Sequence, residues 1–507
     1  MLILLFFIHP PLSAADHRAE ERLHQAIQNP EYVLDHWIAL PTSPLDNAKK
    51  TIHLDLKEAI LLALRYNPNI QNAELDRILQ RYQLRTAYNQ FELQYALAGT
   101  SAIEKSRYSG VGNATTKSYV ATPEFDIKTK LGTQASLKMD NTVASQGLYN
   151  PLLTFSLTQP LLRGFGQSVN EAALLDAIEA ENLNKLLIRQ SVMNQITEVI
   201  AAYRALILSS NNLKNQRWQL DEAKKTYTMN EKKISAGQLE PTANVQQSYQ
   251  VESLSLMLEQ AENDFQTSTQ TLLQTIGLDP EMKLTVPSDV SLNVIELPDS
   301  KSAIKQALQH NTEYLSLQAA YRADKRAYIV AKNQQKWQLD LSANIQTGTL
   351  TNVENSVSNT KNIYNGKNIN ESAGISMTIP LHDINRRNQL IQAKIRLEKD
   401  RLNLIAAQRM LVTAIKNIIN AITSQAKRYE LAKRQVALAS ESYTLEKKKQ
   451  QAGIASALDV NNTQNQLIQA QMGLINAKIA YLNQLSALDR MLGTTLERWH
   501  INLRYTG

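Results

Sequence analysis

The segment LTFSLTQPLLRGFG, residues 153–166, joins a strand pattern directly to a helix pattern. Leu153, Phe155 and Leu157 alternate with hydroxyl-bearing residues, which is the period of two expected of a β-strand with one apolar face. A proline and two glycines follow, and the chain then runs from 167 to 236 without Gly or Pro. At about 1.5 Å per residue, a helix of that length would be roughly 100 Å long. Any fold for this chain must accommodate a membrane-like strand that leads straight into such a helix.

The composition favours long helices over a compact enzyme domain. The 507 residues include only 16 Gly and 14 Pro. This is about half of average usage, so turns are few and the elements are long. Aromatic residues make up 6% of the chain, and the formal charge of +7 is mild for this length. Such a charge is typical of a solvated helical surface and does not by itself indicate nucleic acid.

The residue types present do not indicate catalysis or metal binding. The chain has no Cys, which excludes disulfides, zinc–thiolate sites and thiol catalysis. Its 8 His are scattered without the spacing of a metal site. No nucleophile–base pattern or phosphate-binding loop is visible, and GFG at 164–166 fits a turn rather than a nucleotide fingerprint. The sequence therefore predicts no enzyme, no cofactor, no metal and no nucleic-acid partner.

The first 15 residues have the character of an export signal. An apolar run at 2–8 is followed by the small residues Ser13, Ala14 and Ala15, which resemble a cleavage site. No later stretch reaches the roughly 18 consecutive apolar residues of a membrane-spanning helix. An exported chain without membrane helices is expected to be periplasmic, secreted or an outer-membrane barrel.

The chain consists of two similar halves. YTMNEKKISAG at 227–237 and YTLEKKKQQAG at 443–453 are offset by 216 residues. The alternating pattern before Pro160 has a counterpart before Pro380, after which no Gly or Pro occurs until Gly453. Both halves therefore predict one plan: a helix, strands, a Pro break, a very long helix, a Gly turn and a further helix.

Heptad spacing supports the long helices. Apolar residues recur every seven positions in both halves, the pattern of a coiled-coil seam. The members are Val199, Leu206, Leu213, Leu220 and Tyr227, and then Ile415, Ile422, Tyr429, Val436 and Tyr443. Gly237 and Gly453 follow these helices at positions where a helix C-terminus favours a left-handed residue. Each glycine is therefore expected at the tip of a helical hairpin.

These patterns divide the chain into consecutive segments. The first structural repeat is expected at 51–280 and the second at 301–493. Within them we expect strands at about 95–160 and 339–380, long helices at 167–236 and 385–452, tips at 237–242 and 453–457, and following helices at 243–277 and 458–492. A signal peptide at 1–15 and three equatorial segments, near the middle of the molecule's length, at 16–50, 281–300 and 494–507 complete the division.

The number of strands constrains the assembly. Two principal strands in each half give four per chain, and 118–141 offers room for an extra hairpin in the first half. Pro160 and Pro380 lack an N–H and are expected to break the ladder where strand gives way to helix. Four strands cannot close a barrel, and an open sheet edge cannot sit in lipid. If these strands lie in a membrane, several chains must share one barrel.

In these features the sequence resembles the TolC family of outer-membrane efflux proteins. The resemblance rests on SLTQPLLRGFG at 156–166, on the duplicated strand–Pro–long-helix plan, and on the tips SAGQLEPT at 235–242 and QAGIASALDV at 451–460. It covers about residues 50–500. Each motif alone is weak, whereas their order and duplication are specific.

The resemblance implies a mainly α-helical fold with membrane β-strands. As a homotrimer, three chains would share a twelve-stranded outer-membrane β-barrel that continues into an α-helical barrel, the periplasmic tunnel. The implied function is passive export as the exit duct of a tripartite efflux pump or a type I secretion system. The implied partners are outer-membrane lipid, a periplasmic adaptor and an inner-membrane transporter of RND, ABC or MFS type. The implied location is the outer membrane of a Gram-negative bacterium, with a long periplasmic portion.

In the family, the hairpin tips dock onto the adaptor. By position this implies Ala236, Gly237 and Thr242 in the first half, and Ala452 and Gly453 in the second. The family often has Val before the Gly, and Ala stands there in both halves of this chain. The simpler interpretation is that the glycines only cap helices. A docking role would be an additional role of the same residues.

Some relatives narrow the periplasmic mouth with acidic residues three apart after the second tip. Asp459 matches the first of these positions, and Asn462 stands where the second acid would be. A ring built at this level would therefore carry one acid per chain. Alternatively, Asp459 is an N-cap or first-turn residue of the following helix, where a carboxylate is favourable. Both roles are compatible.

A structural coiled-coil protein without a pore, either periplasmic or secreted, is the alternative from another class. It explains the heptads and the low Gly content. It does not explain alternating strands that end in Pro at matching points of both halves. The cargo is left open, because drugs, metals, peptides and large proteins leave through the same family architecture.

Overall fold

The computed structural model describes residues 52–108, 112–144, 148–238, 240, 242–287, 298–348, 363, 368–452 and 454–501. The predicted signal peptide at 1–15, the segment 16–50 and the tip residue Gly453 lie outside the described residues. The chain forms two compact units, each built from two stretches of sequence. Unit 1 consists of residues 1–68 and 198–291, and unit 2 consists of residues 69–197 and 292–507.

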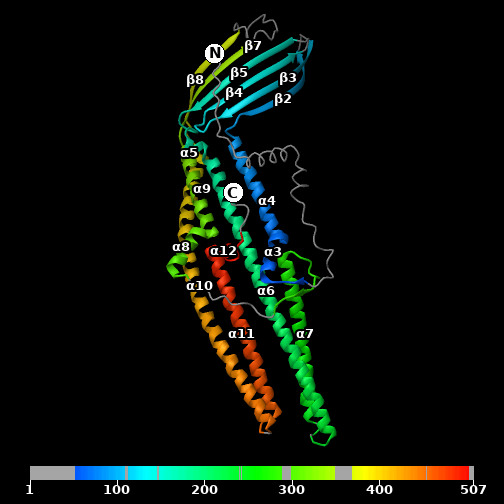
Figure 1. Ribbon diagram of the computed structural model, residues 1–507. Coiled ribbons are helices and arrows are strands. Elements are labelled where there is room, and N and C mark those ends of the chain that lie inside the picture. Colours follow the sequence, from blue (N-terminus) through cyan, green and yellow to red (C-terminus); the bar gives the residue numbers. More distant parts are fainter. Residues whose placement is uncertain are drawn as a thin grey trace. The chain divides into compact units, whose positions relative to one another are not determined.

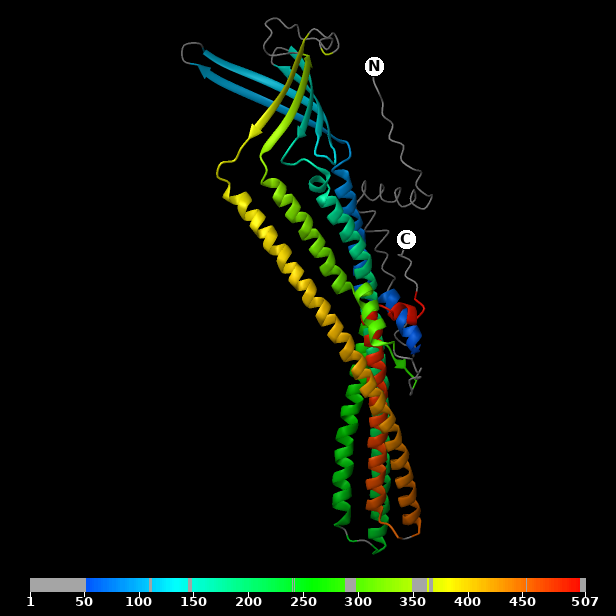
Figure 2. The same ribbon diagram turned by 90° about the vertical axis from the view of Figure 1, so that its left-hand side faces the viewer.

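Unit 2 contains a six-stranded antiparallel sheet, seen in Figures 1 and 2, with strand order β2–β3–β4–β5–β7–β8. The strands are β2 (Gln94–Tyr108), β3 (Gly112–Lys128), β4 (Gln134–Ala144), β5 (Leu148–Pro160), β7 (Gln338–Gly348) and β8 (Ile369–Thr378). The prediction of four strands per chain is therefore wrong. The segment 118–141 forms most of a β3–β4 hairpin, and this hairpin pairs within the sheet because its residues alternate with the same period as their neighbours.

The sheet has one apolar and one polar face. Residues that pair across the strands share a face, because side chains alternate along each strand. One row across the apolar face is Tyr95, Phe125, Leu137, Phe155, Ile345 and Glu371, so the outer end of β8 contributes the only charge in that row. The apolar face is exposed, with Tyr95 at 82% and Ile375 at 68% of their full accessible areas.

Helices adjoin the sheet at four strand ends. α4 (Pro68–Asn89) leads into β2, and β5 leads through the short α5 (Gln167–Asn170) into α6 (Ala172–Ser235). α9 (Thr312–Gln334) leads into β7, and β8 leads into α10 (Ile384–Gln451). Where the sequence predicts one helix over 167–236, the structure has α5 and the 64-residue α6, separated at Glu171.

The remaining helices of unit 2 are α8 (Ser300–His310), α11 (Ala457–Leu492) and α12 (Thr495–Arg498), and α12 packs against α11. α10 lies against α8, α9 and α11. Ile415 and Ile422 of the predicted heptad seam are fully buried, at 0% exposure. These two seam residues are buried as coiled-coil positions should be, while Tyr429, Val436 and Tyr443 of the same series are half-buried.

Unit 1 combines the second part of α6 with smaller elements. These are β1 (Ile52–His53), α3 (Leu56–Tyr66), α7 (Ala243–Ile276) and β6 (Leu284–Thr285), with β1 and β6 in parallel. Asp55 and Glu58 form a capping box that starts α3. α3 packs against α7, and the Tyr203 hydroxyl of α6 donates to the carbonyl of Leu54 at 3.0 Å.

Among the described residues, no helix has an apolar stretch long enough to cross a bilayer.

Gly277→Ala is expected to destabilise unit 1 strongly. Gly277 caps α7 at φ +91, and a Cβ there would lie 2.4 Å from the carbonyl oxygen of Tyr66. The left-handed backbone alone costs about 1–2 kcal/mol for a residue with a Cβ, and the clash adds to that cost. Thermal unfolding followed by circular dichroism in detergent would measure the change.

Gly237→Ala is the matched control, because Gly237 has φ +70 but no atom within 4 Å of a built Cβ. It carries the backbone cost without the clash. Equal losses of stability for the two variants would contradict the argument.

Candidate functional site

The first hairpin tip lies between α6 and α7 in unit 1. Gly237 adopts φ +70, the left-handed conformation that glycine takes without a Cβ penalty. The Gln238 amide donates to the carbonyl of Lys233 at 2.8 Å, and the Gly237 amide donates to that of Ile234 at 2.9 Å. These bonds satisfy carbonyls of the last turn, so Gly237 caps α6.

The residues of this tip are open to solvent. Ala236 and Gly237 are exposed, and space around Gly237 is empty to 4 Å. Thr242 is also exposed and precedes α7 with φ −61 and ψ −29, and its side chain makes no capping hydrogen bond. Its hydroxyl lies 3.4 Å from the carboxylate of Glu240 instead. The Thr242 side chain therefore does not cap α7.

A small apolar core holds α6 and α7 together behind the tip. Its buried members are Leu220, Ala223 and Leu254, and Val251 and Leu258 pack against them. The Gln247 side chain donates to the carbonyl of Ala223 at 3.1 Å, which ties the start of α7 to α6. Arg217 pairs with Glu262 at 2.8 Å farther along the two helices. The tip is thus presented on a packed hairpin.

The second tip lies between α10 and α11 in unit 2, and Gly453 within it is not described. The Ala452 amide donates to the carbonyl of Lys448 at 3.1 Å, and the Ile454 amide donates to that of Lys449 at 2.8 Å. Ile454 is 79% exposed. A single exposed apolar side chain is common on protein surfaces, so Ile454 alone does not mark a docking site.

Asp459 belongs to the capping box that begins α11. Its amide donates to the Ser456 hydroxyl at 3.2 Å, and its carboxylate accepts from the Ser456 amide at 3.1 Å. The hydrogen bond from the Ser456 side chain is the main cause that lowers the pKa of Asp459. Asp459 therefore lies in the first turn, as the alternative reading expected, and it stays ionised at neutral pH. Asn462 is exposed three residues later.

Pro160 stands at the junction of β5 with the helices. Hydrogen bonding to β7 continues past it, since the Leu161 amide donates to the carbonyl of Leu339 at 2.7 Å. Pairing with β4 ends earlier, at Thr158 with Gln134. Because amides alternate in direction along a strand, an N–H at Pro160 would point to the β4 side, beyond the last pair. Only that side of the ladder ends at the proline.

The turn at 129–133, which joins β3 to β4, packs against this junction. Gly132 has φ +99, and a Cβ there would lie 2.5 Å from the carbonyl oxygen of Gly164. The Gly166 amide donates to the carbonyl of Leu131 at 3.1 Å. Glycine is therefore required at 132 both by conformation and by close approach.

Two side chains reinforce the same junction. The Asn170 amide group donates to the carbonyls of Gly164 at 2.8 Å and Gly166 at 3.1 Å. Lys130 pairs with Glu171 at 2.7 Å, and this bond is the main cause that lowers the pKa of Glu171. The β3–β4 turn, the end of β5 and the start of α6 are thus tied together.

The second junction is built differently. Pro380 lies two residues after the end of β8 at Thr378, and Asp383 then caps α10, accepting from the Arg386 amide at 3.0 Å. The Arg386 side chain pairs with Asp383 at 2.9 Å, and the Gln335 side chain donates to the Arg386 carbonyl at 2.7 Å. The start of α10 is thereby fixed to the end of α9.

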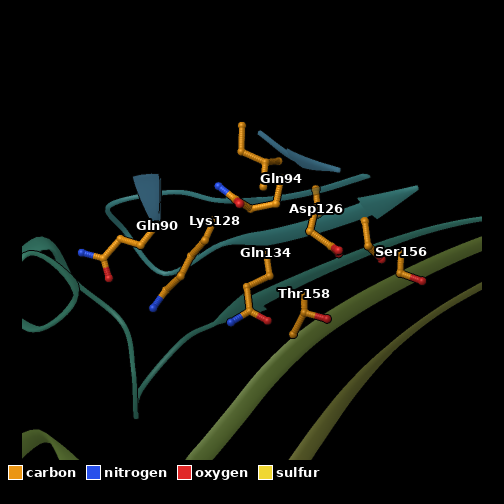
Figure 3. Close-up of a pocket in the computed structure, with 10 residues that line it drawn as sticks. Gln90, Gln94, Asp126, Lys128, Gln134, Ser156 and Thr158 are labelled. Carbon is orange, nitrogen blue, oxygen red and sulfur yellow. The ribbon is translucent and has the colours of Figure 1, made fainter. Parts of the chain in front are cut away.

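The polar face of the sheet is hollowed near these junctions (Figure 3). A cavity of about 340 Å³ is lined mainly by amide and hydroxyl side chains, with one acid and one base. The labelled residues are Gln90, Gln94, Asp126, Lys128, Gln134, Ser156 and Thr158. Such a surface forms a hydrated wall. It lacks the convergent acids, bases or nucleophiles of a reaction centre.

An acidic pair between α9 and α10 was missed by the sequence reasoning. Asp324 and Asp400 line one cavity of about 620 Å³, together with Arg396 and Lys399. Burial raises the pKa of Asp324, and the neighbouring Asp400 raises it further. The two acids are far apart in sequence and belong to no motif, so only the packing of α9 on α10 reveals them. Within the described part of the chain, no cluster of potential ligands fits a metal ion.

Comparison with known proteins gives a consistent result. Residues 303–494 match the model of the family described as outer membrane efflux protein. The alkaline protease secretion protein AprF of Pseudomonas aeruginosa is 24% identical over 337 residues, which cover 65% of this chain and 66% of that relative's length.

Solved structures share the fold. The outer membrane protein VceC of Vibrio cholerae superposes with a TM-score of 0.63 at 17% identity, covering 86% of this chain and 96% of VceC. The MtrE outer membrane channel of Neisseria gonorrhoeae gives 0.63 at 16% identity, covering 87% of this chain and 89% of MtrE.

Asp324→Asn is expected to stabilise the protein at neutral pH. A raised folded-state pKa means that the folded chain loses stability as pH rises through that pKa and Asp324 ionises. The gain from Asn should therefore vanish in acid, below the ordinary pKa range of Asp. Thermal midpoints of both proteins, measured from about pH 3, below the ordinary pKa of Asp, to about pH 8, would test this.

Glu398→Gln is the matched control, because the pKa of Glu398 is shifted in the opposite direction from that of Asp324. Arg401 lowers the pKa of Glu398, so this substitution should bring no gain at neutral pH. A constant difference between Asp324→Asn and the parent protein at every pH would contradict the assignment.

Proposed function

Because the chain belongs to the TolC family of outer-membrane efflux proteins, we propose that it is the exit duct of a tripartite efflux pump or a type I secretion system. The observation that carries this proposal is the sheet of unit 2, with an exposed apolar face, a polar face and four strand ends that continue into helices. An apolar face suits lipid, and a polar face suits a water-filled lumen. The family consists of channel proteins, so the proposed role is passage rather than catalysis.

The proposed assembly is a homotrimer in the outer membrane of a Gram-negative bacterium. The sheet ends in two free edges, β2 and β8, in the described chain. In lipid, such edges must be paired, because unsatisfied backbone groups are costly there. Three copies arranged in a ring would pair every edge and would continue as an α-helical tunnel across the periplasm.

The proposed partners dock at the hairpin tips. Ala236, Gly237 and Thr242 at the first tip and Ala452 and Gly453 at the second would contact a periplasmic adaptor. Open space around Gly237 supports this role at the first tip. An energised inner-membrane transporter of RND, ABC or MFS type would complete the machine. AprF is named for the secretion of a protease, which supports a polypeptide as one class of cargo.

Envelope fractionation is the first test of the duct. When the chain is expressed with a functional signal peptide, it should sediment with the outer-membrane fraction on a density gradient. The unboiled detergent extract should run near three times the 57.0 kDa of one chain. A soluble periplasmic species would overturn the duct and favour a structural coiled-coil protein without a pore.

Asp459→Ala is expected to weaken block of the channel by divalent or cationic ligands. One ionised carboxylate per chain would form an acidic ring at the periplasmic mouth, with Asn462 beside it as a neutral group. Current through single channels, measured with and without a cationic blocker, would quantify the effect.

Ser456→Ala is the matched control for this experiment. It removes the capping hydroxyl and keeps the Asp459 carboxylate. Loss of the cap should cost about 0.5–2 kcal/mol of stability, while block should persist. Equal weakening of block by both variants would assign the effect to helix capping instead of charge.

A further inference from the structure

We propose that three copies of this chain close an eighteen-stranded barrel, in which the β3–β4 hairpin is part of the wall. This inference rests on the trimeric duct of the proposed function. Six strands in each of three copies give eighteen, where the resemblance to the family implies twelve. The partner surface is specific: β8 of one copy pairs with β2 of the next.

The length of each strand is the first support. A bilayer-spanning strand needs about 9–11 residues. β3 has 17 residues and β4 has 11, compared with 11 and 10 for β7 and β8. The hairpin therefore has the reach of a full pair of wall strands.

The sidedness of the hairpin is the second support. Tyr119 and Phe125 of β3 and Leu137 of β4 lie on the exposed apolar face, in register with Phe155 of β5. A hairpin that plugged the lumen or lay outside the barrel would not need to share the apolar face of its neighbours.

The opposite face of the hairpin is polar and bonded across strands. The Thr122 hydroxyl of β3 donates to the Asp140 carboxylate of β4 at 2.9 Å, and Lys138 pairs with Asp140 at 3.2 Å. The same polar face continues on β5 and β7, where the Asn344 side chain donates to the Ser156 hydroxyl at 3.2 Å. The hairpin thus presents a lumen face and a lipid face that match those of the rest of the sheet.

The inner turn of the hairpin is the third support. Its close approach at Gly132 and the Lys130–Glu171 ion pair anchor the turn where β5 meets the helices. The hairpin is therefore fixed at the base of the sheet, on the same level as the wall strands on either side.

The dimensions of an eighteen-stranded barrel are compatible with a duct. Strands about 4.8 Å apart and tilted about 40° give a circumference of about 113 Å for eighteen strands. The corresponding backbone diameter of about 36 Å leaves a wide aqueous lumen.

The free edges have the direction that closure requires. β2 runs away from the helical end of the sheet and β8 returns toward it, so β8 of one copy and β2 of the next would pair antiparallel. Every residue of β8 is exposed, which leaves this edge open to a neighbour. Figure 2 shows β2 and β3 leaning away from the other strands.

Disulfide trapping in the outer membrane tests the closure, because the native chain has no Cys. Ala98→Cys on β2 would be combined in turn with Asn370→Cys, Ser372→Cys and Ser376→Cys on β8, which samples the unknown register. We expect at least one pair to give covalent trimers on oxidation, since facing Cα atoms in a sheet lie within disulfide range. The matched series replaces Ala98→Cys by Ser136→Cys on β4.

The outcomes separate this inference from the proposed function. Cross-links from β8 to β4 alone, in a native outer-membrane trimer, would exclude β2 and β3 from the wall and overturn the eighteen-stranded barrel while leaving the duct intact. If neither series cross-links in such a trimer, a strand count by electron cryo-microscopy decides, and any number below eighteen overturns the inference. A soluble or monomeric chain would overturn the duct itself.

Discussion

In hydrocarbon, every backbone N–H and C=O must find its partner inside the protein, and this constraint governs the whole architecture. In the sheet of unit 2, the backbone groups are hydrogen-bonded along five strand pairs. Among the described residues, the outer edges of β2 and β8 are left without a partner strand. A chain with an exposed apolar face and two open edges is incomplete as a monomer in lipid. In the proposed duct, assembly is therefore a consequence of hydrogen bonding, and the tunnel would follow because the strands continue directly into helices.

The change from strand to helix is made by different means in the two halves. After β5 the chain passes through two positive-φ glycines and a short helix, and Asn170 holds both glycine carbonyls. After β8 a single capping aspartate, Asp383, starts α10 at once. The first junction must also accept the turn of the β3–β4 hairpin, whereas no hairpin turn of the described residues is hydrogen-bonded through its backbone to the second. The duplicated plan is therefore kept in outline while local chemistry is adapted to what packs nearby.

Periodicity and Gly and Pro positions reveal the long elements of this fold from sequence alone. The heptads around Ile415 and Ile422 predict a buried seam, and Gly237 predicts a capped tip, because both depend on local spacing. The sequence offers 118–141 as an extra hairpin but predicts only four principal strands, because the pairing of β3 with β2 and of β4 with β5 is a long-range property. The Asp324–Asp400 pair was missed because the contact between α9 and α10 is also a long-range property. The docking role of the tips could not be derived from the sequence, because it depends on a partner protein.

The position of the additional hairpin has a physical logic. The chain must leave the helical end through β2 and return to it through β5, so strands can be inserted between them only in pairs. One added strand would leave α6 on the wrong side of the membrane, whereas a hairpin restores both direction and sidedness. The family match covers 303–494, within the second half, whereas β3 and β4 lie in the first half. In the proposed assembly, the duplicated chain would widen its barrel in one half and keep the other unchanged, because hydrogen bonding in the sheet depends only on matched edges.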